Sequence, residues 1–251
     1  MSIFIGKNTI LLDCVDSTNS YARSHAEWPD GTVITTREQQ QGRGQQGNFW
    51  ESEAGRNLTF SIVLKPTFIP PEEQFYLSKA ISLGVADFLS VYLDNVSIKW
   101  PNDIYVDDSK IAGILIEQSI TGNIISQSIV GIGLNVNQTI FRSNAPNPTS
   151  IKLRAAREFN LHESLSHLCT YIENRYLQLQ TDLIYEMNND YMKRLYRLGI
   201  WSDFESQGER FKARIIKVED SGRLILERMD GATDGFYFKE VSYVLNSESS
   251  H

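Results

Sequence analysis

The sequence predicts an α+β protein in which helices flank a mixed sheet and a small β domain follows. Apolar runs with strand spacing fill much of residues 10–137, apolar residues with helical spacing dominate residues 161–198, and only short strands joined by turns follow Gly199. We therefore expect a main unit at residues 1–199, a small β domain at 200–246 and a loose polar tail at 247–251.

The first elements are three strands and one helix start. Residues 10–15 predict a short buried strand, and the tetrad Asp16-Ser17-Thr18-Asn19 offers several N-caps for a helix behind it. Residues 32–36 and 58–64 predict the next two strands, on either side of a glycine-rich loop.

The middle of the chain predicts a helix, a hairpin and two long strands. Apolar spacing over residues 72–89 indicates an amphipathic helix behind Pro70-Pro71. Residues 97–106 predict a hairpin, and residues 111–117 and 129–137 predict strands whose glycines would let a ligand or another backbone lie close.

The last part of the chain changes from helices to short strands. Residues 165, 168, 172, 176, 179, 183, 187, 191 and 195 are apolar at helical spacing. Beyond Gly199, residues 210–218, 223–227 and 234–238 predict strands joined by turns at 220–222 and 230–231. A unit this small depends on the larger one for burial.

Composition excludes several classes of protein. The 251 residues include 24 basic and 31 acidic side chains, a net charge of −7 that disfavours a large DNA-binding surface. No apolar run reaches the roughly 20 residues of a membrane span and the start lacks a signal sequence, so we expect a cytoplasmic protein.

The residue types typical of metal and hydrolase sites are scattered. The four histidines form no zinc-binding pattern, and no GxSxG elbow is present. Cys14 and Cys169 lie in apolar surroundings without partners at metal-ligand spacing, so we expect two buried free thiols.

The loop at residues 39–50 is the most unusual segment, with glycines at 42, 44 and 47 beside Arg43 and Trp50. It lacks the Lys and Ser/Thr of a P-loop, and a strand follows it instead of the helix of a Rossmann motif. A kinase-type loop has no supporting signatures downstream. A structural turn and a loop that binds an anionic ligand both remain open.

Five blocks carry a family resemblance when they are taken in order. They are Asp16-Ser17-Thr18-Asn19, Gln41-Gly42-Arg43-Gly44, Lys99-Trp100-Pro101-Asn102-Asp103, Lys110-Ile111-Ala112-Gly113-Ile114-Leu115-Ile116-Glu117 and Gly131-Ile132-Gly133-Leu134-Asn135. Together they closely resemble biotin protein ligases. The resemblance implies a class II synthetase-like catalytic fold closed by an SH3-like β barrel.

The resemblance also implies an activity. Members of the family activate biotin with ATP to give biotinyl-5′-adenylate, with Mg²⁺ accompanying ATP, and transfer biotin to a lysine of a biotin carboxyl carrier domain. This chain resembles the short form without a DNA-binding domain, and either a monomer or a homodimer is compatible with it. Lipoate ligation and a non-catalytic biotin or biotinyl-adenylate sensor are the alternatives.

The family positions assign roles to individual residues. Biotin contacts are expected from Ser17, Thr18, Asn19, Gln39, Gly42, Arg43 and Gly113, and adenylate contacts from Gly44, Trp50, Asn102, Lys110 and Asn135. Lys110 and Arg43 are the expected catalytic residues, since joining a carboxylate to a phosphate requires fixed positive charge. Asp103 is the expected Mg²⁺ ligand, with a turn-stabilising role as its alternative.

Two loop positions depart from the family pattern. Gln45 and Asn48 stand where many members carry arginine, so we expect phosphate contact and retention of the adenylate to be arranged differently there. Arg56 is the residue that we expect to replace part of the missing charge.

Overall fold

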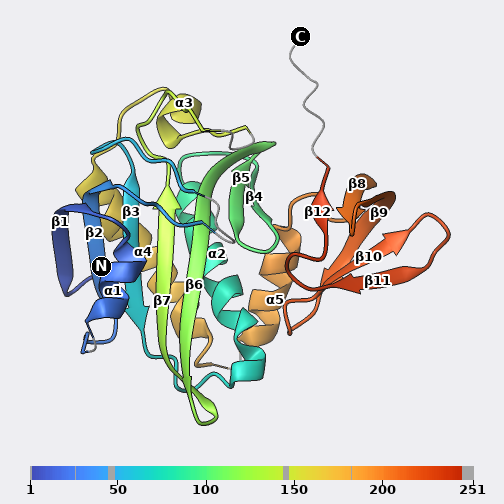
Figure 1. The fold of residues 1–251 in the computed structure, drawn as a ribbon, viewed down its shortest axis with the longest axis horizontal. Coiled ribbons are helices and arrows are strands. Elements are labelled where there is room, and N and C mark those ends of the chain that lie inside the picture. Colours follow the sequence, from blue (N-terminus) through green and yellow to red (C-terminus); the bar gives the residue numbers. More distant parts are fainter. Residues whose placement is uncertain (1, 26, 45–48, 144–146, 182, 245–251) are drawn as a thin grey trace.

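The computed structural model describes residues 2–25, 27–44, 49–143, 147–181 and 183–244, which form two sheets and a set of helices (Figure 1). The predicted α+β class is therefore confirmed. The predicted loose tail at 247–251 lies outside the described residues.

The first sheet has seven strands in the order β1-β2-β3-β7-β6-β5-β4. These are β1 (Thr9–Val15), β2 (Thr32–Gln39), β3 (Leu58–Leu64), β4 (Val96–Lys99), β5 (Asp103–Val106), β6 (Ser109–Thr121) and β7 (Ile124–Leu134). Only β1 and β2 run parallel, and the other neighbours are antiparallel. The sheet is mixed, as predicted.

Strand β1 corrects two expectations. It pairs with β2 alone, so it forms an edge of the sheet and most of its side chains are exposed or half-buried, including Leu11. The predicted buried strand is therefore an edge strand. Cys14 lies on it and is exposed, whereas Cys169 is buried as expected.

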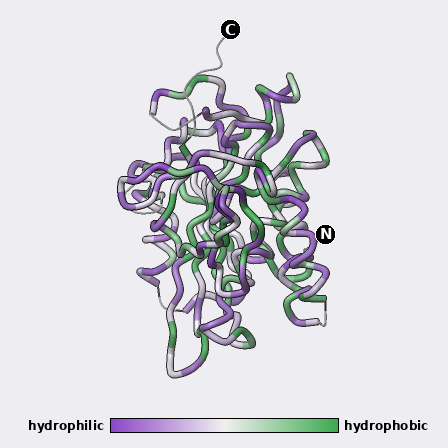
Figure 2. Tube along the Cα trace, turned by 90° about the vertical axis from the view of Figure 1, so that its right-hand side faces the viewer, coloured by the Kyte–Doolittle hydropathy of each residue, from purple (hydrophilic) through white to green (hydrophobic). Residues whose placement is uncertain are grey.

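Helices lie on both faces of the first sheet, and strand alternation separates the two faces. The helices are α1 (Thr18–Ser24), the 3₁₀ helix η2 (Pro71–Glu73), α2 (Phe75–Leu89), α3 (Ile151–Ala155), α4 (Leu161–Gln178) and α5 (Ile184–Lys193). Ile34 and Val63 pack with Ala22 of α1 on one face, while Val33 and Ile62 belong to the main core on the other. Figure 2 shows hydrophobic stretches running through the centre of the molecule.

Helix α2 is buried on nearly every side, which the predicted amphipathic pattern did not anticipate. It packs against β4 and β5 of the first sheet and against the helices α4 and α5 (Figure 1). At Gly84 a Cβ atom would come within 2.6 Å of the Cα atom of Ile172, so α4 can approach this closely only because residue 84 has no side chain.

The second sheet forms the C-terminal part of the chain, with all neighbouring strands antiparallel. Its order is β11-β10-β9-β8-β12, and the strands are β8 (Ser202–Ser206), β9 (Glu209–Val218), β10 (Leu224–Arg228), β11 (Thr233–Phe236) and β12 (Ser242–Tyr243). Phe204, Ile215 and Leu224 belong to the same hydrophobic cluster as α2. The second sheet thus shares its core with the main unit.

A buried lysine joins the second sheet to the helices. Lys79 of α2 lies 2.8 Å from Asn188 Oδ1 of α5 and 3.2 Å from Asp220 Oδ1, in the turn between β9 and β10. Burial lowers the pKa of the ammonium, which the Asp220 carboxylate partly counteracts. Truncation of Lys79 would therefore leave Asp220 without its buried partner.

None of the helices in the described ranges is long and apolar enough to cross a membrane.

Candidate active site

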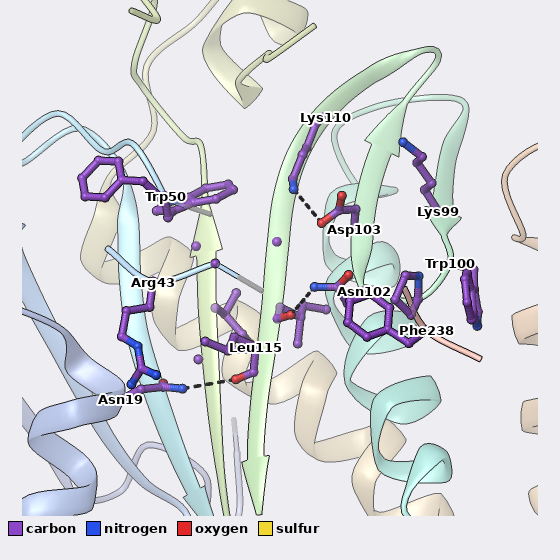
Figure 3. Close-up of a pocket in the computed structure, with 18 of the residues that line it drawn as sticks. Asn19, Arg43, Trp50, Lys99, Trp100, Asn102, Asp103, Lys110, Leu115 and Phe238 are labelled. Atoms are coloured by element: carbon purple, nitrogen blue, oxygen red, sulfur yellow. Dashed lines mark hydrogen bonds and ion pairs between the residues drawn. The ribbon is translucent and has the colours of Figure 1, made fainter. Parts of the chain in front are cut away.

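A cavity of about 400 Å³ lies over the first sheet, with the segment around Trp50 on one side and the second sheet on the other (Figure 3). Its described walls come from α1, the end of β2, the 99–103 segment, β6, β7 and the second sheet. The motif residues that are distant in sequence therefore meet at one site.

Hydroxyl and amide groups line one end of the cavity. The backbone N–H of Thr18 donates to Gln39 Oε1 over 2.9 Å, and Ser17 caps helix α1. The Ser61 hydroxyl lies 2.7 Å from Thr18 Oγ1 and 2.6 Å from Asn19 Oδ1. The network holds these groups in fixed orientations before any ligand arrives.

The protein also binds the amide nitrogen of Asn19. Its nitrogen donates to Glu117 Oε2 over 2.9 Å and lies 3.3 Å from the carbonyl oxygen of Leu115 (Figure 3). A Cβ atom on Gly131 would overlap Asn19 Oδ1, so this glycine makes room for the amide. Asn19 lines the cavity, but its polar atoms are already used by the protein.

The structure separates the two expected catalytic residues. Arg43 lies near Asn19, away from Lys110 (Figure 3), and its Nη1 atom is 3.5 Å from Glu117 Oε1. Glu117 also binds Arg23. Arg43 is about half exposed, so its side chain has room to swing when the ion pair breaks.

Lys110 instead pairs with Asp103, the expected metal ligand. Lys110 Nζ lies 2.7 Å from Asp103 Oδ1, and both side chains are mostly buried. Antiparallel pairing of β5 with β6 places the two residues on neighbouring strands. Backbone bonds to Asn147 and from Thr149 hold Lys110 in position.

Trp50 lies across two glycines of the sheet. Gly113 of β6 and Gly133 of β7 face each other in the antiparallel register. A Cβ atom on Gly133 would overlap the indole, and one on Gly113 would come within 3.2 Å of it. The sequence predicted that a ligand or another backbone would lie close to these glycines, whereas in the structure the Trp50 side chain does so. The indole centroid is 5.7 Å from Lys110 Nζ.

The indole nitrogen of Trp50 is buried and has no hydrogen-bond partner among the described residues. An unpaired buried donor of this kind is unfavourable. The nitrogen packs against Gly133, where a Cβ atom would overlap it.

Three of the expected contact residues have structural roles. The Asn102 amide donates to the carbonyl of Ile114 over 2.6 Å. The Asn135 amide donates to the carbonyl of Thr149, and Asn135 lies outside the described cavity lining. Gly42 also lies outside that lining, and its carbonyl accepts from the backbone N–H of Trp50 over 2.9 Å, which closes the base of the loop.

The structure describes the two ends of the glycine-rich loop, residues 39–44 and 49–50. Gln45 and Asn48, the two positions that depart from the family pattern, lie outside the described residues. Gly44 lines the cavity. Arg56 does not line it, since its guanidinium lies between Glu53 and Glu158, so the expected replacement of loop charge has no support.

The second sheet supplies a wall that the sequence did not predict. Its lining residues are Phe204, Leu224, Phe238, Lys239, Val241, Ser242 and Tyr243. The Trp100 indole N–H donates to the carbonyl of Gly222 over 2.9 Å, and the Trp100 and Phe238 rings meet edge to face. Trp100 itself is part of a recognised motif, but the residues that it contacts lie more than 100 positions later in the chain.

Lys99 lies in an aromatic enclosure beside the cavity. Its ammonium is 3.1 Å from the Tyr105 hydroxyl and lies over the rings of Tyr105 and Tyr243. Burial lowers the pKa of Lys99 to about 8, and Asp103 partly counteracts this.

Positive charge predominates around the cavity. The charged residues in its described lining are Arg43, Lys99, Asp103, Lys110 and Lys239. Four cations against one carboxylate favour an anionic ligand. In the part of the chain that the structure describes, no group of three or more His, Cys, Asp or Glu residues could hold a metal ion by itself.

Sequence comparison identifies relatives of this chain. Residues 11–135 match the model of the biotin/lipoate A/B protein ligase family. The chain is 30% identical over 226 residues to the biotin–[acetyl-CoA-carboxylase] ligase of Paracoccus denitrificans, with 86% of this chain and 92% of that protein covered. It is 28% identical over 246 residues to the bifunctional ligase/repressor BirA of Bacillus subtilis (strain 168), with 90% of this chain and 71% of that protein covered.

Structural comparison supports the same relationship at the level of the fold. The biotin protein ligase of Aquifex aeolicus in complex with biotin and ATP aligns with a TM-score of 0.81 at 24% identity, over 95% of this chain and 99% of that one. The biotin protein ligase of Leishmania major in complex with biotinyl-5-AMP aligns with a TM-score of 0.61 at 20% identity, over 92% and 99%. The extent of the sequence match and the shared fold show that this chain belongs to the biotin/lipoate A/B protein ligase family.

Proposed function

We propose that this protein is an ATP-dependent biotin–protein ligase, which forms biotinyl-5′-adenylate and transfers biotin to a lysine of a biotin carboxyl carrier domain. The observation that carries the proposal is the cavity itself. It has a prearranged polar network at one end and the Lys110 ammonium in its middle, beside a tryptophan over a glycine-lined strip of sheet. The names of the relatives support biotin as the acid.

Biotin would bind with its ureido ring at the polar end. The ring offers two N–H donors and one carbonyl, and it would meet the hydroxyl groups of Ser17 and Thr18 and the amide of Gln39. The apolar side chains of Leu115 and Ile132 line the cavity beyond them and suit the thiophane ring and the valeryl chain. The carboxylate would then extend toward Lys110.

The first step would join the biotin carboxylate to ATP. A carboxylate oxygen attacks the α-phosphorus, an oxygen–phosphorus bond forms, and the bond to the bridging oxygen breaks as pyrophosphate leaves. Two anions must approach each other, so the Lys110 ammonium would offset their repulsion and stabilise the charge that develops on the α-phosphate. Arg43 would join it after leaving Glu117 and Ser20, since its side chain is half exposed and both of these contacts are 3.5 Å long.

The second step would transfer biotin to the acceptor. The uncharged amine of the carrier lysine attacks the carbonyl carbon of the mixed anhydride, an amide bond forms, and AMP leaves with the electrons of the cleaved bond. Asp103 is the one carboxylate in the described lining and would take the proton that the amine loses.

Mg²⁺ would arrive with ATP, and the residues present fit that form of binding. Mg²⁺ commonly takes one or two carboxylates together with phosphate oxygens and water, and Asp103 supplies one carboxylate in the cavity. When bound, the ion would neutralise part of the phosphate charge.

Biotin-dependent ATP–pyrophosphate exchange tests the proposal without knowledge of the acceptor. Exchange with biotin, its absence with lipoate, and its loss in Lys110→Ala are the expected results. Exchange with lipoate alone would identify a lipoate-type ligase. Biotin binding without exchange would identify a sensor.

A further inference from the structure

Lys239 is a cavity residue from a part of the chain that carries none of the recognised motifs. It lies between β11 and β12, directly after Phe238, whose ring contacts Trp100. Its side chain is exposed and lines the cavity that also contains Lys110. The second sheet therefore adds a cation to the wall opposite Trp50.

The backbone at Lys239 has a conformation that lysine disfavours. The N–H of Glu240 donates to the carbonyl of Tyr237 over 3.1 Å, so residues 237–240 form a tight turn. Lys239 is the third residue of this turn and has φ 84°, a region in which glycine is favoured because a Cβ atom is crowded there.

The turn is held too firmly to relax this strain. The Ser206 hydroxyl donates to the carbonyl of Glu240 over 2.6 Å, and the N–H of Tyr237 donates to Glu240 Oε2 over 2.7 Å. Val241 is buried directly after the turn. Packing does not explain the lysine, since the side chain is exposed. A strained residue that is kept in a cavity wall is typical of a functional position.

The other cations of the cavity have partners within the described part of the protein, and Lys239 differs from them in this respect. Arg43 lies against Glu117, Lys110 pairs with Asp103, and Lys99 donates to Tyr105. Lys239 makes no ion pair with any residue that the structure describes. Its ammonium is therefore available to an anionic ligand.

The arrangement of the cavity indicates which part of the ligand it meets. Figure 3 shows the labelled residues running from Asn19 and Arg43 on one side, through Lys110 and Asp103, to Trp100 and Phe238 on the other. If biotin occupies the first side and the α-phosphate lies at Lys110, the outer phosphates extend toward Phe238.

We propose that Lys239 binds the β- and γ-phosphates of ATP and the pyrophosphate that leaves, an inference that rests on the proposed ligase function. The lysine supplies, from the second sheet, positive charge for the phosphate chain. The strained backbone at residue 239 then lowers the stability of the protein, and the lysine is kept there because it binds the nucleotide.

Nucleotide binding by three variants tests this assignment. The probes are adenosine 5′-(α,β-methylene)triphosphate, which cannot be cleaved between its α- and β-phosphates, and AMP, which lacks the outer phosphates. Lys239→Gly removes both charge and strain, and Lys239→Gln removes only charge. Gln207→Gly is the matched control, since Gln207 also has a positive φ, of 51°, in an exposed turn outside the described lining.

Both Lys239 variants should bind the triphosphate analogue about 3- to 10-fold more weakly, because they lose one contact between a phosphate and a charge that solvent partly screens. Both should bind AMP as the wild type does. Lys239→Gly should melt no lower than the wild type, and Gln207→Gly should bind both nucleotides normally. Unchanged affinity for the analogue, or an equal loss for AMP, would overturn the assignment.

A separate assay distinguishes failure of the inference from failure of the proposed function. Biotin-dependent ATP–pyrophosphate exchange by the wild type tests the ligase function, while the ratio of analogue to AMP affinity tests Lys239. If only the Michaelis constant for the carrier domain changes in Lys239→Gln, the lysine recognises the acceptor protein and the phosphate assignment is wrong.

Discussion

The ammonium of Lys110 lies 2.7 Å from a carboxylate oxygen of Asp103, so two residues expected to act on the same phosphates neutralise each other in the free protein. A ligand with more negative charge can compete for the lysine. Binding of ATP would therefore replace one carboxylate with a phosphate at the ammonium, and Asp103 would become available to a metal ion or a proton.

Lys110→Ala should reduce biotin-dependent ATP–pyrophosphate exchange by about 100- to 1,000-fold, the usual effect of losing one charge-stabilising donor. Lys110→Arg keeps the charge and should retain part of the rate. Biotin affinity, measured by calorimetry, should change little because the polar end of the cavity is untouched. An alanine variant that exchanges at the wild-type rate would remove Lys110 from the mechanism.

Gly133→Ala should lower the free energy of unfolding by about 1–3 kcal/mol, because its new methyl group overlaps the Trp50 indole. Gly113→Ala should cost less, since its Cβ atom would come within only 3.2 Å of the ring. Urea denaturation measures both effects. The cost of Gly133→Ala should disappear in a Trp50→Ala background, and persistence there would show that Trp50 is not the obstacle.

Glu173→Ala should lower the free energy of unfolding by roughly 2–4 kcal/mol. The Glu173 carboxylate is 1% exposed and accepts from the backbone N–H groups of Ile3, Phe4 and Ile5, so its loss leaves several donors unpaired. Thermal and urea denaturation give the value. Glu163→Ala, at an exposed site in the same helix, is the control and should have a much smaller effect. Similar losses in the two variants would contradict the proposed anchoring.

Lys99→Met should stabilise the protein at pH 7 by roughly 1–3 kcal/mol. Burial lowers the pKa of Lys99 from 10.5 to about 8, so below pH 8 the folded state holds an unfavourably buried charge. Between pH 8 and 10.5 the Lys99 side chain binds a proton more readily in the unfolded chain than in the folded protein. Its contribution to the free energy of unfolding of the wild type therefore rises with pH in this range. The advantage of the variant should shrink as the pH approaches 10.

Urea denaturation from pH 7 to pH 10 measures this difference, with Lys193→Met as the exposed control. A variant less stable than the wild type at pH 7 would mean that the rings of Tyr105 and Tyr243 more than offset the burial of the charge.

One thiol should react with Ellman's reagent in the native protein and two after denaturation. Cys14 is exposed on the edge strand, whereas Cys169 is buried and its burial raises the pKa of the thiol to about 12. Cys14→Ser should abolish the fast reaction. Fast reaction of both thiols in the folded protein would contradict the burial of Cys169.

Local sequence patterns determined most strands of the first sheet and the helix α2. Strand propensity, turn residues and helical spacing predicted β2, β3, β6, β7 and α2 with ends up to five residues from the observed ones, since these signals depend on neighbours in the chain. The same signals failed at β1, because an apolar strand in the middle of a sheet and one at its edge have similar sequences. Only the number of pairing partners makes β1 exposed.

The motifs by themselves determined the family and most of the residues that meet in the cavity. Tertiary structure alone decided which groups are free to act: it paired Lys110 with Asp103, held Arg43 against Glu117 and used the Asn102 amide internally. It also brought Lys239 to the cavity from the far end of the chain. Contacts between residues so distant in sequence depend on how the two sheets pack, and no local pattern encodes that packing.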